Sequence, residues 1–175
     1  VSLRDSAGNE LVPGGGALET LHSVDLSGLD ARIREVEVIG ACDVTNTLCG
    51  PEGASQVYGP QKGASPEAVV RLDTALQHFG QVVSKQTGRD ILDLPGGGAA
   101  GGLGAGLAAF TGAQLRPGID LVFEAYGDME AQARKADMII SGEGSVDGQT
   151  LHGKVIAGVA ALAKRHGKPL VVLAG

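Results

Sequence analysis

Two short apolar runs near the end of the chain, Ala136-Asp-Met-Ile-Ile140 and Leu170-Val-Val-Leu-Ala-Gly175, decide the fold class. Between them, Val155, Val159 and Leu162 keep the three- and four-residue spacing of a helix. Almost continuous apolar strands, joined by a connection long enough for a crossover helix, are typical of a parallel sheet covered by helices. We therefore predict an α/β fold, in which ligands bind beyond the carboxyl ends of the strands.

The clearest helix pattern lies further upstream. Ser65-Pro66-Glu67 combines a capping serine, a proline suited to the first helical position and an acidic residue in the first turn. Apolar residues follow at helical spacing from Val69 to Val83, and Gly88 is a suitable C-terminal stop. We predict a helix between Ser65 and Gly88.

The segments around this helix are less regular. Residues 34–43 alternate and then become apolar, which predicts a strand that delivers Asp43 to its carboxyl end. Residues 44–64 are rich in Asn, Gly and Pro, and we predict a long loop there without a regular element. Other predicted elements are a short strand over 91–94 and short helices over 17–21, 117–126 and 128–135.

Composition excludes several classes of protein. The 175 residues are 43% hydrophobic and 19% charged, and the net charge of −6 with scattered Lys and Arg argues against a nucleic-acid-binding surface. No apolar stretch is long enough to span a bilayer and no signal peptide is recognisable, so we expect a cytoplasmic protein with no membrane partner. Because the chain starts at Val1 without Met and ends in an apolar run, we expect an interior piece of a longer protein.

The glycine-rich run Leu94-Pro-Gly-Gly-Gly-Ala-Ala-Gly-Gly-Leu-Gly-Ala-Gly106 contains a G-x-G-x-x-G pattern. The pattern alone is weak, because the strand before it is short and the acidic residue expected about twenty positions later would be inside a helix. Two interpretations stay open. The N–H groups of Gly96, Gly97 and Gly98 could hold a phosphate at a helix start, or the glycines could serve close helix packing.

A second glycine-flanked segment, Gly142-Glu-Gly-Ser-Val-Asp-Gly-Gln-Thr150, follows a predicted strand. Its carboxylates, Glu143 and Asp147, have the chemistry to bind Mg²⁺ through oxygen or to accept a proton from a substrate hydroxyl. A plain surface turn would have a similar composition.

Isolated polar residues add further candidates. Asp43 and Asn46 lie at or just after the end of the strand predicted over residues 34–43, and Lys62 lies in the Asn-, Gly- and Pro-rich segment 44–64. Lys154 lies near the start of a predicted helix, where it could contact a phosphate. Each has a plain structural alternative, namely a cap or turn for the Asp and a solvated surface position for each Lys.

Taken together, these phrases resemble the glycerate kinase family of bacteria, and they occur in family order along nearly the whole chain. The matching phrases are Asp43-Val-Thr-Asn46, Gly50-Pro-Glu-Gly-Ala-Ser55, Gly59-Pro-Gln-Lys-Gly-Ala-Ser65, Gly97-Gly-Ala-Ala-Gly-Gly-Leu-Gly104, Pro117-Gly-Ile-Asp120, Gly142-Glu-Gly144, Asp147-Gly-Gln-Thr150 and His152-Gly-Lys154. The chain departs from the family in lacking a Pro within residues 46–50 and in having Ser145 where a basic residue is usual.

The resemblance implies ATP-dependent phosphorylation of D-glycerate with Mg²⁺, generally at the 2-hydroxyl. It also implies a two-domain protein with its site in the interdomain cleft. Residues 1–135 would form the smaller α/β domain, and residues 136–175 would return into a truncated, Rossmann-like parallel three-layer domain whose remainder is missing from this chain.

We assign the site residues by matching them to this mechanism. The catalytic set is Asp147, Glu143, Asp43 and Lys62, with Asp147 and Glu143 also the candidate metal ligands. The nucleotide contacts are Gly96, Gly97, Gly98 and Lys154, and the substrate contacts are Asn46, Gln149 and Thr150.

Two other functions remain open at this level. The first is an NAD(P)-dependent oxidoreductase that uses the glycine pattern for a dinucleotide. The second is a non-catalytic ligand-binding domain, which would agree with our expectation that the isolated piece is inactive.

Overall fold

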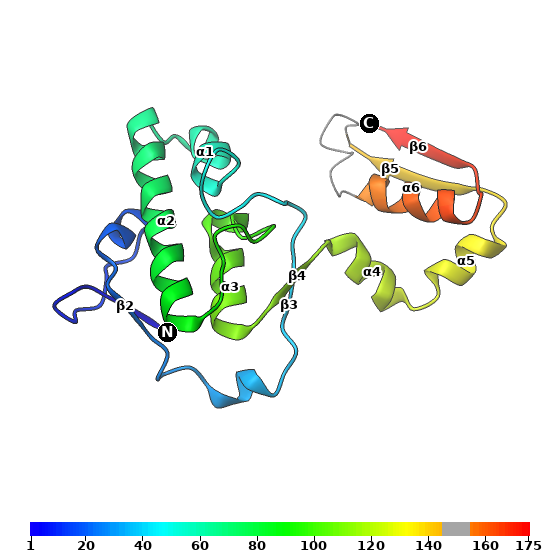
Figure 1. Cartoon of the computed structure of the whole chain (residues 1–175). Helices are drawn as coiled ribbons and strands as arrows, with labels where there is room; N and C mark the ends of the chain where they lie inside the picture. Colours follow the sequence, from blue (N-terminus) through cyan, green and yellow to red (C-terminus); the bar gives the residue numbers. More distant parts are fainter. Residues whose placement is uncertain (145–154) are drawn as a thin grey trace. The chain divides into compact units, whose positions relative to one another are not determined.

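A computed structural model describes residues 1–144 and 155–175 (Figure 1). The chain forms two compact units, Val1–Leu115 and Arg116–Gly175, which we describe separately. The boundary between these units lies about twenty residues before the domain boundary predicted between residues 135 and 136. The predicted domain boundary stays a prediction. Among the described residues, no helix is both long and apolar enough to cross a membrane.

The first unit is built around one long helix, α2 (Pro66–Thr87), which lies beside α1 (Ala54–Tyr58) and α3 (Leu103–Thr111) (Figure 1). The other elements are the strands β1 (Ser2–Arg4), β2 (Ser23–Asp25), β3 (Ile39–Ala41) and β4 (Gln114–Arg116), and the 3-10 helices η1 (Gly15–Thr20), η2 (Ala31–Arg34), η3 (Pro60–Lys62) and η4 (Ala99–Gly101). β1 pairs with β2 in antiparallel register, and β3 pairs with β4.

Helix α2 confirms the strongest sequence prediction. The Ser65 hydroxyl accepts a hydrogen bond from the Ala68 N–H at 3.2 Å, and Gly88 ends the helix in the left-handed region with φ 71°. Its apolar face carries Leu76, Phe79 and Val83 into a core that also contains leucine, isoleucine and alanine side chains from the rest of the unit. Burying each large apolar side chain stabilises the fold by about 1.5–3 kcal/mol.

The second unit contains the predicted parallel strand pair. β5 (Ile139–Glu143) and β6 (Leu170–Ala174) pair in parallel, with Ile139 opposite Leu170, and α6 (Val155–Arg165) is the helix between them in sequence. Two further helices, α4 (Gly118–Tyr126) and α5 (Met129–Lys135), pack against α6. The mixed α/β prediction is therefore confirmed, and the strand pair supplies its parallel part.

Several local predictions are wrong. The segment 44–64 contains α1 and η3, because its glycines flank the sequence Ala54–Tyr58 and do not interrupt it. The strand predicted over 34–43 is confined to β3, since its partner β4 is only three residues long. Residues 91–94 form no strand, and Ile91 is instead a core residue with 1% of its surface exposed.

The glycine-rich run packs against backbone from the segment before α1. A Cβ atom on Gly98 would lie 2.2 Å from the Thr47 carbonyl oxygen, and one on Gly104 would lie 2.3 Å from the Gly96 carbonyl oxygen. The Gly98 N–H donates to the Asn46 carbonyl oxygen at 2.9 Å. Close contact of this kind is possible only where side chains are absent, so packing explains why Gly98 and Gly104 are glycines.

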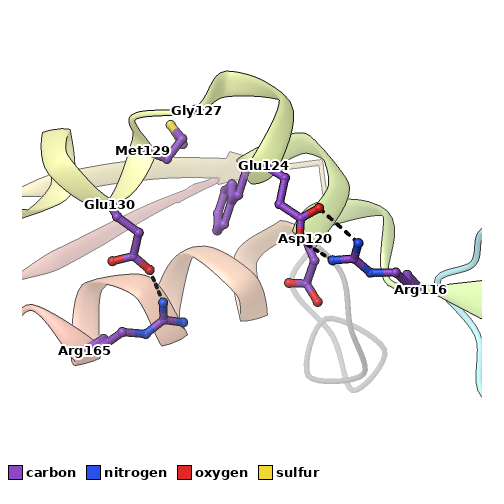
Figure 2. Close-up of a pocket in the computed structure, with 8 residues that line it drawn as sticks. Arg116, Asp120, Glu124, Gly127, Met129, Glu130 and Arg165 are labelled. Atoms are coloured by element: carbon purple, nitrogen blue, oxygen red, sulfur yellow. Dashed lines mark hydrogen bonds and ion pairs between the residues drawn. The ribbon is translucent and has the colours of Figure 1, made fainter. Parts of the chain in front are cut away.

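Ion pairs connect the helices of the second unit. Arg116, the last residue of β4, pairs with Glu124 of α4, and Arg165 of α6 pairs with Glu130 of α5 (Figure 2). His166 contacts the same Glu130 carboxylate. This hydrogen bond from His166, together with the charge of Arg165, lowers the pKa of Glu130 below its ordinary value. Glu130 therefore links α5 to the end of α6 through two basic partners.

The glycine packing predicts opposite effects for two substitutions in the same helix. Gly104→Ala should destabilise the full-length protein by about 1–3 kcal/mol, because the new methyl group meets backbone. Gly106→Ala should stabilise it by up to about 1 kcal/mol, because its Cβ would make only an ordinary 3.8 Å contact with Phe110 and alanine favours a helix. Urea unfolding followed by circular dichroism measures both changes, and equal effects would contradict the packing argument.

The Glu130 contacts predict a pH dependence of stability. The pKa of the Glu130 carboxyl is lower in the folded chain than its unfolded value near 4.5. The ionised carboxylate therefore contributes fully to the free energy of unfolding above pH 4.5, and this contribution is lost as the pH falls through the folded pKa. Lowering the pH from about 6 to about 3 should therefore reduce the melting temperature of the natural protein more than that of Glu130→Gln. Asp137→Asn, an exposed carboxylate in the same unit, is the matched control. A parallel pH profile for Glu130→Gln and the natural protein would contradict the role of this ion pair.

Candidate functional site

The predicted site residues fall into three groups. Asp43, Asn46, Lys62 and Gly96–Gly98 belong to the first unit, whereas Glu143 is the last residue of β5 in the second unit. Asp147, Gln149, Thr150 and Lys154 lie outside the described residues. The structure therefore tests the geometry of the first group in most detail.

Asn46 joins three segments of the first unit. Its amide nitrogen donates to the Glu52 carbonyl oxygen at 2.8 Å, and its amide oxygen accepts a hydrogen bond from the Tyr58 hydroxyl at 2.5 Å. Its backbone carbonyl accepts the Gly98 N–H described above. Asn46 thus ties the glycine-rich run to α1. Its predicted contact with substrate stays a prediction, and the amide atoms that such a contact would use already hold protein partners.

The N–H groups expected to hold phosphate are also engaged. Gly97 donates to the Leu94 carbonyl oxygen at 2.8 Å, and Gly98 donates to Asn46. Gly96 has φ 81°, and there is no space for a side chain at this position, because a Cβ atom would lie 2.8 Å from the Cys42 sulfur. These contacts favour the packing interpretation of the three glycines, while their phosphate role stays a prediction.

A small cavity in the first unit brings several of the predicted phrases together. Its volume is about 160 Å³. It is lined by Gly15, Ala54, Ser55, Tyr58, Gly59, Lys62, Leu72, Leu76 and Gly101. Its wall thus comes from η1, α1, η3, α2 and the turn at the glycine-rich run. We call it the α1–α2 cavity.

Local backbone geometry explains how Lys62 reaches this cavity. Gly59 lets α1 pass directly into η3, since a Cβ there would lie 2.4 Å from the Ser55 carbonyl oxygen. Gly63, with φ 88°, then ends η3 directly after Lys62. The phrase Gly59-Pro-Gln-Lys62 is thereby folded so that the lysine lies at the cavity wall. Lys62 is exposed and forms no ion pair with any residue of the described segments.

The structure adds site residues that the sequence interpretation missed. Ser55 is buried, with 7% of its surface exposed, and Tyr58 is half-buried. Burial is the main cause that raises the pKa of the Tyr58 hydroxyl, so this group stays protonated near neutral pH. Ser55 belongs to a phrase that carried the family resemblance, but no spacing rule marked it as functional. The sequence gives no signal for it, because α1 also contains the polar residue Gln56.

Cysteine chemistry is not supported near this cavity. Burial, followed by the charges of Asp73 and Asp93, raises the pKa of the Cys49 thiol. A raised pKa leaves the thiol protonated, which is the less nucleophilic form. Asp73 itself is engaged, since its carboxylate accepts the Gly50 N–H at 3.0 Å.

A larger cavity lies in the second unit, between α4, α5 and α6 (Figure 2). It has a volume of about 380 Å³ and is lined by Arg116, Asp120, Phe123, Glu124, Gly127, Met129, Glu130 and Arg165. Four of these residues form the two ion pairs described above, so their charges are already compensated. Of the predicted site residues that the structure describes, none lines this cavity. The α1–α2 cavity is therefore the stronger candidate.

In the described segments, no cluster of three or more His, Cys, Asp and Glu side chains is arranged to hold a metal ion. Glu143 is half-buried at the carboxyl end of β5, where ligands of parallel sheets bind. A carboxylate at that place has the chemistry of a Mg²⁺ ligand. Its proposed co-ligand, Asp147, lies outside the described residues.

Comparison with known proteins supplies the context for these motifs. The model of the glycerate kinase family matches residues 1–175. The chain is 48% identical to glycerate 2-kinase of Escherichia coli K12 over 173 residues, covering 99% of this chain and 45% of that protein. It is also 48% identical to glycerate kinase of Bacillus subtilis 168, again with 99% and 45% coverage.

A solved structure gives the same result in three dimensions. A crystal structure assigned as glycerate kinase 2 from Salmonella typhimurium LT2 superposes with a TM-score of 0.84 and 55% identity. The match covers 99% of this chain and 46% of that one. The chain thus spans less than half the length of the relatives that it matches. Sequence and structure agree that it belongs to the glycerate kinase family.

Proposed function

We propose that the full-length protein is a glycerate kinase, which transfers the γ-phosphoryl group of ATP to D-glycerate, with the 2-hydroxyl as the favoured acceptor. The observation that carries this proposal is the family match over the whole chain, including the phrases that meet at the α1–α2 cavity. The activity belongs to the full-length protein, since this chain covers 45% of its relatives.

The mechanism we propose depends on positioning and charge compensation. Asp147 is the first choice to accept the proton of the glycerate hydroxyl, with Glu143 and Asp43 as the other candidates. The hydroxyl oxygen then bonds to the γ-phosphorus as the bond to the β-phosphate oxygen breaks, and ADP leaves. Lys62 or Lys154 offsets the negative charge on the oxygens of the transferring phosphoryl group. Glu143 and Asp147 would hold Mg²⁺, which supplies charge compensation at the phosphates when bound.

The second unit supports a proposal about the rest of the protein. One face of the β5–β6 pair leaves Ile140, Val171 and Leu173 exposed, although strands of parallel sheets are normally covered on both faces. We propose that the remainder of the full-length chain covers this face as part of a Rossmann-like domain. Residues 1–135 would then form the smaller domain of a cytoplasmic, two-domain enzyme.

The structure does not support the dinucleotide-binding alternative. A dinucleotide fingerprint follows a strand, whereas residues 91–94 form none. No observation favours the non-catalytic alternative in particular. Assays distinguish both alternatives from the proposed kinase. The oxidoreductase alternative predicts NAD(P)H binding, and the non-catalytic alternative predicts ligand binding without ATP consumption.

The proposed function predicts glycerate-dependent release of ADP by the full-length protein in the presence of ATP and Mg²⁺. Asp147→Asn should lower kcat by about 100-fold or more, because general bases typically contribute that much. A coupled ADP assay, with phosphoglycerate identified by NMR, measures both. Asp137→Asn is the matched control. Absence of glycerate-dependent turnover in the natural protein would overturn the function, whereas near-normal turnover in a folded Asp147→Asn variant would overturn only the role of Asp147.

A further inference from the structure

The most unusual feature of the α1–α2 cavity is the Ser55 hydroxyl. Only 7% of the surface of Ser55 is exposed, and the residue lines the cavity. Its backbone carbonyl accepts the Gly59 N–H, but within the described segments its hydroxyl has no hydrogen-bond partner. Buried polar groups are almost always hydrogen-bonded. A hydroxyl without a described protein partner, on a buried residue at a cavity wall, is therefore suited to a ligand.

The size of the cavity restricts that ligand. A volume of about 160 Å³ is close to that of an engineered protein cavity of about 150 Å³ that holds benzene. Sites for larger organic ligands have volumes of about 300–1,000 Å³. The α1–α2 cavity, which is open to solvent on one side, thus has room for an acid of about three to six carbons.

The wall chemistry restricts the ligand further. Leu72 and Leu76 supply apolar surface, whereas Lys62 supplies a positive charge without an ion-pair partner in the described part of the chain. An inorganic anion would use the charge but leave the leucine surface unused. A short carboxylic acid uses both, because its carbon chain contacts the leucines and its carboxylate forms charge-assisted hydrogen bonds.

We infer that the α1–α2 cavity is the subsite for the organic acid, in which Lys62 and Ser55 bind its carboxylate. This inference rests on the proposed function and refines it. It replaces the phosphate role proposed above for Lys62 with a contact to the acceptor acid, so the transferring phosphate is left to Lys154 and the other candidates. Leu72 and Leu76 then contact the carbon chain of the acid.

The test uses the full-length protein and separates binding of the two substrates. Lys62→Gln and Ser55→Ala should each raise KM for D-glycerate, Lys62→Gln by about ten-fold or more, while KM for ATP stays unchanged. Calorimetric titration with D-glycerate in the absence of nucleotide should show the same loss. Lys62→Arg should restore part of the affinity.

Two matched controls come from the same unit. Lys85→Gln removes an exposed charge from α2, and Ser84→Ala removes a buried hydroxyl that has no partner in the described residues. Neither residue lines the cavity. Both variants should bind D-glycerate as the natural protein does. Circular dichroism verifies that each variant is folded.

The outcomes separate this inference from the function on which it rests. A rise in KM for ATP alone in Lys62→Gln would overturn the inference and assign the lysine to phosphate. Unchanged D-glycerate affinity in both cavity variants would also overturn it. If the natural protein shows no glycerate-dependent turnover, the proposed function fails. Titration with lactate and with inorganic phosphate then still tests the cavity, because only lactate should bind in a Lys62-dependent way.

Discussion

The backbone contact between the glycine-rich run and the segment before α1 is the constraint on which the first unit depends. Gly98 approaches Asn46 and Thr47 so closely that no Cβ fits, and its N–H bonds to the Asn46 carbonyl. Gly104 makes an equivalent approach to Gly96 inside the run. These contacts fix the start of α3 against a loop that precedes it by some fifty residues. A helix rich in glycine, which is intrinsically unfavourable, is thus stabilised by tertiary packing.

The candidate site follows from that contact. Once Asn46 is fixed, its amide holds Tyr58 and so orients α1. The short helix in turn places Ser55 toward α2, and the Gly59 backbone directs the chain to Lys62. A polar, breaker-rich segment therefore becomes the ordered wall of a cavity. The polar groups of the loop serve this order first, which is why Asn46 and the glycine N–H groups have protein partners.

Sequence reasoning succeeded where one local signal dominates. The caps of α2, with Ser65 and Gly88, and the parallel strands β5 and β6 were predicted because each depends on short-range pattern. It failed for α1, whose five residues are held by tertiary contacts and show no periodicity long enough to recognise. Ser55 could not have been predicted as a site residue, since its importance comes from burial and from the absence of a described partner. The roles of Asp147 and Lys154 remain predictions from motif alone.

The dimensions of the cavity separate the two substrates of the proposed kinase. A volume of about 160 Å³ suits the acid and is well below that of sites for larger ligands, so most of a nucleotide would contact residues other than the cavity wall. Within the glycine-rich run, Gly97 and Gly98 have already used their N–H groups. The remaining described candidate is Glu143, which ends β5 at the edge where parallel sheets bind ligands. We therefore propose that the acid binds to the helical unit and the phosphates to the unit that carries the parallel strands.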